Sequence, residues 1–160
     1  MTQEAVIKSW RSMIKVSHDF FHCWRQVLLA ELGGEKTEEL TLRFWEKVAE
    51  ATARAYAAAG VVEKGGLEGL VRAIARSSEI MGETVQVERD GRDFLLIHTA
   101  CPWVDSYRAY GGGNCQPGCD RWFVETARAL LPECTVVTES SIPAGQGKCV
   151  RRFSGKPDQD

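Results

Sequence analysis

The side chains best suited to chemistry are six cysteines, five of which lie between residues 101 and 149. Cys101 is followed by Pro102, a residue that suits the first turn of a helix. A thiol at a helix N-terminus lies near the positive end of the helix dipole, which favours the thiolate. The sequence therefore predicts a nucleophile or metal ligand at Cys101, with an inert packed thiol as the alternative. His98 is a candidate base or ligand beside it, unless it is a hydrogen-bonded histidine at a strand end.

A second group of candidates is the segment CQPGCD at residues 115–120. Three residues separate Cys115 from Cys119, and the proline and glycine between them favour a tight loop that could offer two thiolates to zinc. Cys149, which follows a glycine-containing turn, is the third predicted metal ligand. Cys119 is alternatively a nucleophile at a predicted helix start. Asp120 is a candidate base, a ligand or a helix cap.

The elements that must position these residues begin with helices. Apolar residues recur at helical spacing in three segments, with glycines between them. The predicted helices cover residues 10–32, 37–59 and 67–81.

The hydrophobic period then changes to that of strands. Asp90-Gly91 between two apolar runs is typical of a hairpin. One helix is predicted to begin at Pro102 and another at Cys119 or Asp120, and two more strands follow. The predicted strands are 84–89, 92–99, 134–139 and 147–153. This order predicts an α+β fold: three N-terminal helices, then a four-stranded antiparallel sheet with one or two helices inserted between its hairpins.

Length and composition restrict the class of protein. The 160 residues predict one domain over 1–153 and a polar, frayed tail over 154–160. A formal net charge of −2 lacks the basic footprint of a nucleic-acid binder. The sequence has no apolar run long enough for a membrane span and no signal-peptide pattern, so we expect a cytoplasmic protein without a membrane partner. In that compartment the cysteines are expected to be thiols rather than disulfides.

Three short motifs carry a family resemblance: HTACPW around Cys101, CD at Cys119-Asp120, and TESSIPAGQGKCVRRF around Cys149. Over roughly residues 40–153 the chain resembles the L-2-amino-thiazoline-4-carboxylic acid hydrolase-like family. The resemblance implies hydrolytic opening of a cyclic amidine in a thiazoline ring, and it assigns the site to Cys101, Cys119, Asp120 and Cys149. The chain departs from that pattern at residues 146–148, where it has QGK and the family commonly carries an acidic residue.

The order of elements is also similar to 4-vinyl-reductase-type small-molecule-binding domains and to TRAPP-like vesicle-tethering subunits. These resemblances imply a helical layer on an antiparallel sheet, dimers formed through helices and, in some members, a zinc ion held by cysteines. Ser141 stands where one of those cysteines is expected.

Two hypotheses about function therefore stay open, together with a third about assembly. The first is a hydrolase of a small cyclic amidine or related C–N compound, with Cys101 or Cys119 as nucleophile and Asp120 or His98 as base. The second is a non-catalytic domain that binds a small apolar or aromatic ligand, with a metal held by cysteines. The third is a homodimer formed through a helical face.

Overall fold

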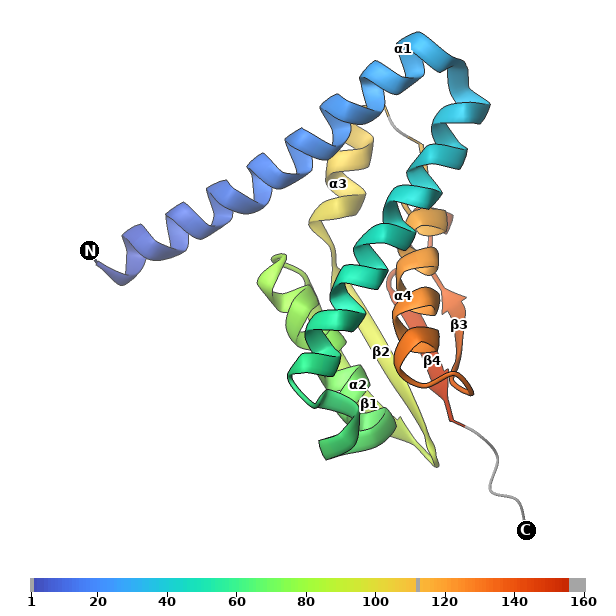
Figure 1. Cartoon of the computed structure of the whole chain (residues 1–160). Helices are drawn as coiled ribbons and strands as arrows, with labels where there is room; N and C mark the ends of the chain where they lie inside the picture. The colour runs from blue at the N-terminus through green and yellow to red at the C-terminus, as the bar shows by residue number, and fades with distance from the viewer. Residues whose placement is uncertain (1, 112, 156–160) are drawn as a thin grey trace.

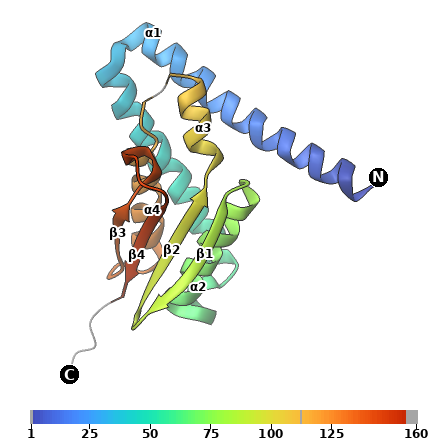
Figure 2. The same cartoon turned by 180° about the vertical axis from the view of Figure 1, so that it is seen from behind.

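The computed structural model describes residues 2–111 and 113–155, and it confirms the predicted α+β class. Helices lie on one face of a single antiparallel sheet, and the strands are seen from the other side in Figure 2. The elements, in chain order, are α1 (Gln3–Ala58), α2 (Val61–Ile80), β1 (Thr84–Asp90), β2 (Asp93–Ala100), α3 (Pro102–Ala109), α4 (Gln116–Leu130), β3 (Thr135–Ser140), a short 3₁₀ turn (Ile142–Ala144) and β4 (Cys149–Ser154).

The first two predicted helices are the two arms of α1, which bends sharply at Gly33 (Figure 1). Gly33 has φ 76° and ψ 174°, a backbone conformation that is nearly restricted to glycine. The second predicted helix does not begin at Thr37 as a separate element. Thr37 lies within α1 and its hydroxyl donates to the carbonyl of Gly33 at 2.7 Å, so it supports the bend from inside.

Two helix starts lie earlier than predicted. The third helical segment begins at Val61 rather than after Gly66, because the helix tolerates a non-helical residue at Gly66 with φ 53°. Helix α4 begins at Gln116, so Cys119 and Asp120 lie inside its first turns rather than at its cap. The cap position belongs to Cys115. By contrast, Cys101 is the N-cap of α3 and Pro102 follows in the first turn, as predicted.

The sheet has the strand order β1-β2-β4-β3, with every neighbouring pair antiparallel. The predicted hairpin at Asp90-Gly91 joins β1 to β2, and Asp90 pairs with Asp93 across the turn. Most residues of the central strands β2 and β4 are buried, including three in succession in each. Their cross-strand pairs are Phe94 with Phe153, Leu96 with Arg151 and His98 with Cys149.

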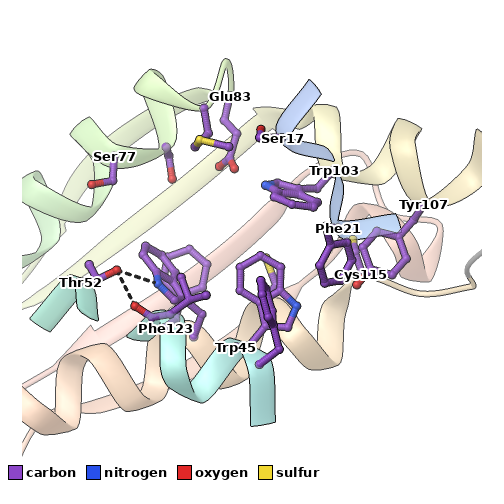
Figure 3. Close-up of a pocket in the computed structure, with 16 residues that line it drawn as sticks. Ser17, Phe21, Trp45, Thr52, Ser77, Glu83, Trp103, Tyr107, Cys115 and Phe123 are labelled. Atoms are coloured by element: carbon purple, nitrogen blue, oxygen red, sulfur yellow. Dashed lines mark hydrogen bonds between the residues drawn. The ribbon is translucent and has the colours of Figure 1, made fainter. Parts of the chain in front are cut away.

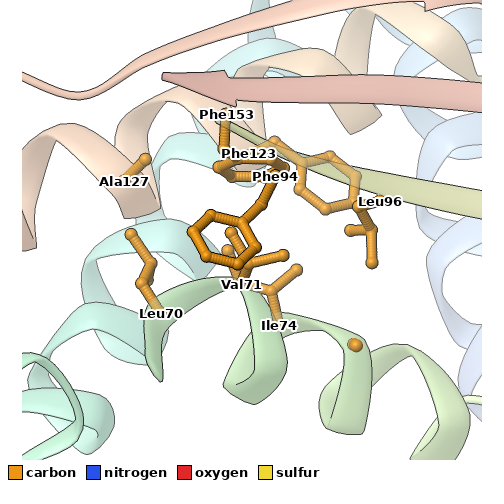
Figure 4. Packing of buried hydrophobic residues seen from close by; sticks show 9 residues of the cluster. Leu70, Val71, Ile74, Phe94, Leu96, Phe123, Ala127 and Phe153 are labelled. Carbon is orange, nitrogen blue, oxygen red and sulfur yellow. The ribbon is translucent and has the colours of Figure 1, made fainter. Parts of the chain in front are cut away.

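The hydrophobic core joins this inner sheet face to α2 and α4 (Figure 4). Phe153, Leu96, Leu70 and Ile74 have no exposed surface, and Phe123 from α4 packs edge-on against Phe153. The core lies at one end of the inner face, beneath α2 and the C-terminal half of α4. The other end is left to His98, Cys149 and the residues around them.

Two further predictions concern a membrane span and the C-terminal tail. Within the described residues, no helix is long and apolar enough to cross a bilayer. Ser154, assigned to the predicted tail, is instead the last residue of β4, and residues 156–160 lie outside the described part of the chain.

The bend in α1 gives a test of this architecture. Replacing Gly33 by alanine forces a β-carbon into a strained conformation, so we expect Gly33→Ala to lower the free energy of unfolding by about 1–3 kcal/mol. Gly34→Ala is the matched control, because Gly34 has no positive φ and an added β-carbon there meets no atom within 4 Å. That change is expected to leave stability unchanged or to raise it slightly. Urea unfolding measures both, and equal stabilities of the two variants would contradict the bend.

Candidate functional site

A cavity of about 350 Å³ opens between both arms of α1, the end of α2, α3 and α4 (Figure 3). This volume lies within the range of small-molecule sites. Most of its wall is apolar and aromatic. Its lining residues are Ser17, Phe21, Phe44, Trp45, Val48, Thr52, Ser77, Ser78, Met81, Glu83, Trp103, Tyr107, Cys115, Cys119, Trp122 and Phe123. We call this space the aromatic cavity.

Two close contacts hold the tryptophans of the wall in place. A β-carbon built at Gly118 would come within 2.5 Å of the Trp45 indole, so only glycine allows this approach of α4 to α1. His18 stacks on Trp103 with ring centroids 3.8 Å apart. The sequence indicated Gly118 only as part of a loop. In the structure this glycine allows the Trp45 indole to pack closely against α4.

Next to the aromatic cavity is a narrow compartment of about 10 Å³, roughly the space of one water molecule. Glu83, Cys115 and Cys119 line both spaces, which makes them neighbours. The remaining lining residues are His98, Cys101, Val104, Gln116, Ser141, Pro143, Cys149 and Arg151. Four predicted cysteines and His98 therefore meet at one place, although they come from two helices with their N-caps, α3 and α4, and from two strands, β2 and β4. We call this space the cysteine compartment.

His98 is buried and held by hydrogen bonds at one ring nitrogen. Its Nε2 lies 2.9 Å from Glu83 Oε2 and 3.2 Å from Ser78 Oγ. Since a carboxylate can only accept, a proton lies on Nε2, and in the neutral ring Nδ1 is then an acceptor. Nδ1 is buried without a partner among the described residues. His98 thus has the form of a base oriented by a carboxylate.

Burial opposes the thiolate that the sequence predicted at the helix starts. Desolvation raises the pKa of Cys119 to about 12 and that of Cys115 to about 11. It also raises the pKa of Cys101 far above its ordinary value, although backbone amides of α3 act in the other direction. At Cys101 desolvation therefore outweighs the helix terminus and favours the protonated thiol.

Asp120 lines neither space. Its Oδ1 accepts hydrogen bonds from Thr138 at 2.7 Å and from Nη2 and Nε of Arg151 at 3.1 and 3.2 Å. Arg151 is buried, and its guanidinium lies 4.3 Å from the centre of the Phe123 ring. Asp120 is therefore placed to position Arg151 and α4, and it is not placed to act as a base on a molecule in the aromatic cavity.

The zinc site of Cys115, Cys119 and Cys149 stays a prediction. Over residues 2–111 and 113–155, no three His, Cys, Asp or Glu side chains are grouped so as to hold a metal ion. Cys149 instead accepts a hydrogen bond at Sγ from the backbone amide of Ile142 at 3.2 Å. All six cysteines are free thiols.

The predictions from sequence missed Glu83, Arg151, Trp103 and Trp122. Glu83 follows Gly82 in the short connection between α2 and β1 and carries no motif. Arg151 lies directly before Arg152 in β4, so its charge alone did not distinguish it as the buried one of the pair. Trp45 belongs to the aromatic residues of the first two predicted helices, whose spacing fits a core face and equally the lining of a pocket.

Comparison with known proteins identifies the family. The family model described as L-2-amino-thiazoline-4-carboxylic acid hydrolase matches residues 13–153. No curated protein matches the sequence.

Among solved structures, the phenol-responsive sensory domain of the transcription activator PoxR with phenol superposes with a TM-score of 0.62 at 14% identity, covering 86% of this chain and 74% of that one. A trafficking protein particle complex subunit 3 from Naegleria fowleri, covalently bound to palmitic acid, gives a TM-score of 0.49 at 12% identity, covering 89% and 97%. The likeness to the sensory domain is one of fold.

The raised thiol pKa values predict low reactivity. At pH 7.5 we expect iodoacetamide to modify Cys115 and Cys119 at least tenfold more slowly in the native protein than in 8 M urea, because few of the buried thiols are ionised. The native rate should rise as the pH approaches 11. Peptide mass spectrometry after timed quenching measures each site, and native rates equal to those in urea would contradict the assigned protonation state.

Proposed function

Because the chain belongs to the L-2-amino-thiazoline-4-carboxylic acid hydrolase family, we propose that it hydrolyses a small cyclic amidine or related C–N compound bound in the aromatic cavity. The observation that carries the proposal is the position of Cys119. Its side chain lines the aromatic cavity and also the compartment that contains His98. A substrate in the cavity is thereby brought to a thiol that shares a compartment with a base.

The roles follow from the hydrogen bonds. Cys119 is the nucleophile, in preference to Cys101, because Cys101 lines only the cysteine compartment. His98 accepts the thiol proton at Nδ1, while Glu83 holds the ring through Nε2. A protonated thiol needs such a base at the moment of attack, since its raised pKa leaves little free thiolate.

The reaction is balanced as follows. Cys119 Sγ bonds to the amidine carbon, its proton passes to His98, and the π electrons of the C=N bond move onto nitrogen. These electrons then re-form the C=N bond, and the bond between that carbon and the ring's leaving atom breaks. The leaving atom takes the proton from His98. Water then attacks the same carbon and releases Cys119 as the thiol. The sum consumes one water molecule and opens the ring.

A second candidate is a domain that binds an aromatic molecule without turnover. The raised thiol pKa values and the mainly apolar wall favour it. The solved sensory domain with the same fold is described as phenol-responsive.

A homodimer is a further part of the proposal, based on the first arm of α1. This arm extends away from the rest of the molecule (Figure 1), and its apolar residues are spaced in heptads. Phe20 is 74% and Met13 65% exposed, and Val6 and Val27 continue the same row at intervals of seven. Positions repeating every seven residues form the seam of a coiled coil, so the partner that fits is a second copy with the same seam. We call this row the heptad stripe.

We also propose a cytoplasmic location. The six cysteines are free, which suits a reducing compartment. Oxidised, cross-linked protein isolated from cells would contradict this part.

The hydrolase proposal is tested with 2-aminothiazoline and its 4-carboxylate as substrates, and ring opening is measured by mass spectrometry. We expect turnover of at least one compound and a fall in kcat of at least about 100-fold in Cys119→Ser. Cys134→Ser is the matched control, because Cys134 lines neither space, and it should retain the wild-type rate. Undiminished turnover in Cys119→Ser would overturn thiol catalysis. Saturable binding of both compounds without any turnover would support the second candidate instead.

The homodimer is tested by sedimentation velocity at 5–100 μM protein. We expect a dimer for the wild-type chain and a monomer for Phe20→Glu, because a buried charge in the seam opposes pairing. Phe20 is mostly exposed in the single chain, so its replacement should not unfold the protein. Lys8→Gln makes the same change of charge on the same arm outside the heptad stripe and should remain dimeric. A monomeric wild-type chain at 100 μM would overturn this part of the proposal.

A further inference from the structure

The charge distribution in the aromatic cavity identifies the kind of molecule that fits it. Of the 16 residues that line it, Glu83 is the only acidic one, and none is lysine or arginine. This residue lies at one edge of the cavity, beside Ser17 and above the aromatic rings in the view of Figure 3. Its side chain is only 10% exposed. The lining therefore presents one poorly solvated negative charge and no positive charge.

We infer that the ligand of this cavity is a planar cation without a carboxylate group, of the amidinium or protonated heteroaromatic amine type. The inference rests on the proposed function, because it concerns the ligand of the same cavity. It also separates this chain's substrate from the amino-thiazoline carboxylic acid of the family name, which carries an anionic group that this lining cannot pair.

The buried guanidinium of Arg151 does not change the net negative charge of this lining. Arg151 lines only the cysteine compartment, and both its Nε and its Nη2 donate to Asp120. Its guanidinium is covered on one side by the Phe123 ring. The positive charge is therefore paired with Asp120 behind the cavity wall.

His98 does not neutralise Glu83 by necessity. The 2.9 Å contact between His98 Nε2 and Glu83 Oε2 can form with a neutral imidazole that carries its proton on Nε2, so it needs no positive charge on the ring. Oε2 is the atom that contacts His98, and we assign the other carboxylate oxygen to the ligand.

The aromatic wall favours the same charge. Faces of Trp, Phe and Tyr rings attract cations, and the attraction is greater where water is excluded. Trp45 and Trp103 lie nearly perpendicular at 5.3 Å, with Phe21 5.5 Å from each, so a flat ligand can meet ring faces from several directions. An anion would instead face both the π-electrons and the carboxylate of Glu83 in a low-dielectric space.

Three probes of the same shape test this inference by titration calorimetry at pH 7.5: benzamidine, which is a cation, benzamide, which is neutral, and benzoate, which is an anion. We expect benzamidine to bind at least tenfold more tightly than benzamide, and benzoate to bind most weakly. Glu83→Gln should weaken benzamidine binding at least tenfold and change benzamide binding less than threefold. Glu79→Gln is the matched control, because Glu79 is an exposed acid of α2 outside the cavity, and it should retain the wild-type preference.

The outcomes separate this inference from the function on which it rests. Benzoate binding as tight as benzamidine, or a benzamidine affinity unchanged in Glu83→Gln, would overturn the cationic ligand while leaving a ligand-binding cavity. If none of the three probes binds at millimolar concentration, the proposed function fails and the inference fails with it.

Discussion

The buried guanidinium of Arg151 is the contact on which the arrangement of the site depends. It enters from β4, bonds to Asp120 of α4 and lies against Phe123 of the same helix. A buried charge is tolerated only where it is paired and hydrogen-bonded, so this pair fixes where α4 lies on the sheet. Because Cys119 directly precedes Asp120, the same pair decides where that thiol lies. The arginine contributes by holding two elements together rather than by meeting a ligand.

The exclusion of water from the aromatic cavity has opposite effects on ligand binding and on the reactivity of the thiols. An apolar wall excludes water, which strengthens binding of a flat ligand but penalises any ionised thiol nearby. Cys115 and Cys119 therefore remain protonated, and their chemistry must depend on a base. His98 and Glu83 supply that pair at the border of both spaces. The same carboxylate gives the cavity its charge, so one residue connects recognition with proton transfer.

Helix α3 contacts the first arm of α1 and also forms part of the aromatic cavity. His18 and His22 extend from the arm, where His18 stacks on Trp103 and His22 bonds to Ser106 at 3.0 Å. Desolvation lowers the pKa of His22 to about 4, so its ring is neutral at physiological pH and fits among its aromatic neighbours. Trp103 is also a wall of the aromatic cavity. A partner bound along the arm would therefore lie one helix away from the ligand.

The sequence by itself determined the class and order of the elements, since the spacing of apolar residues and the positions of the glycines between them are local properties. The hairpin at Asp90-Gly91, the break at Gly33 and the cap at Cys101 were all predictable for that reason. It also identified His98 and the four cysteines that line one compartment, through motifs and residue type. Only the tertiary structure decided that Glu83 borders this compartment and that the tryptophans of α1 and α3 line the cavity beside it, because long-range packing leaves no trace in spacing. The protonation of Cys101 and Cys119 was likewise beyond the sequence: a helix terminus is visible in it, whereas the desolvation that outweighs the terminus depends on which distant side chains cover the thiol.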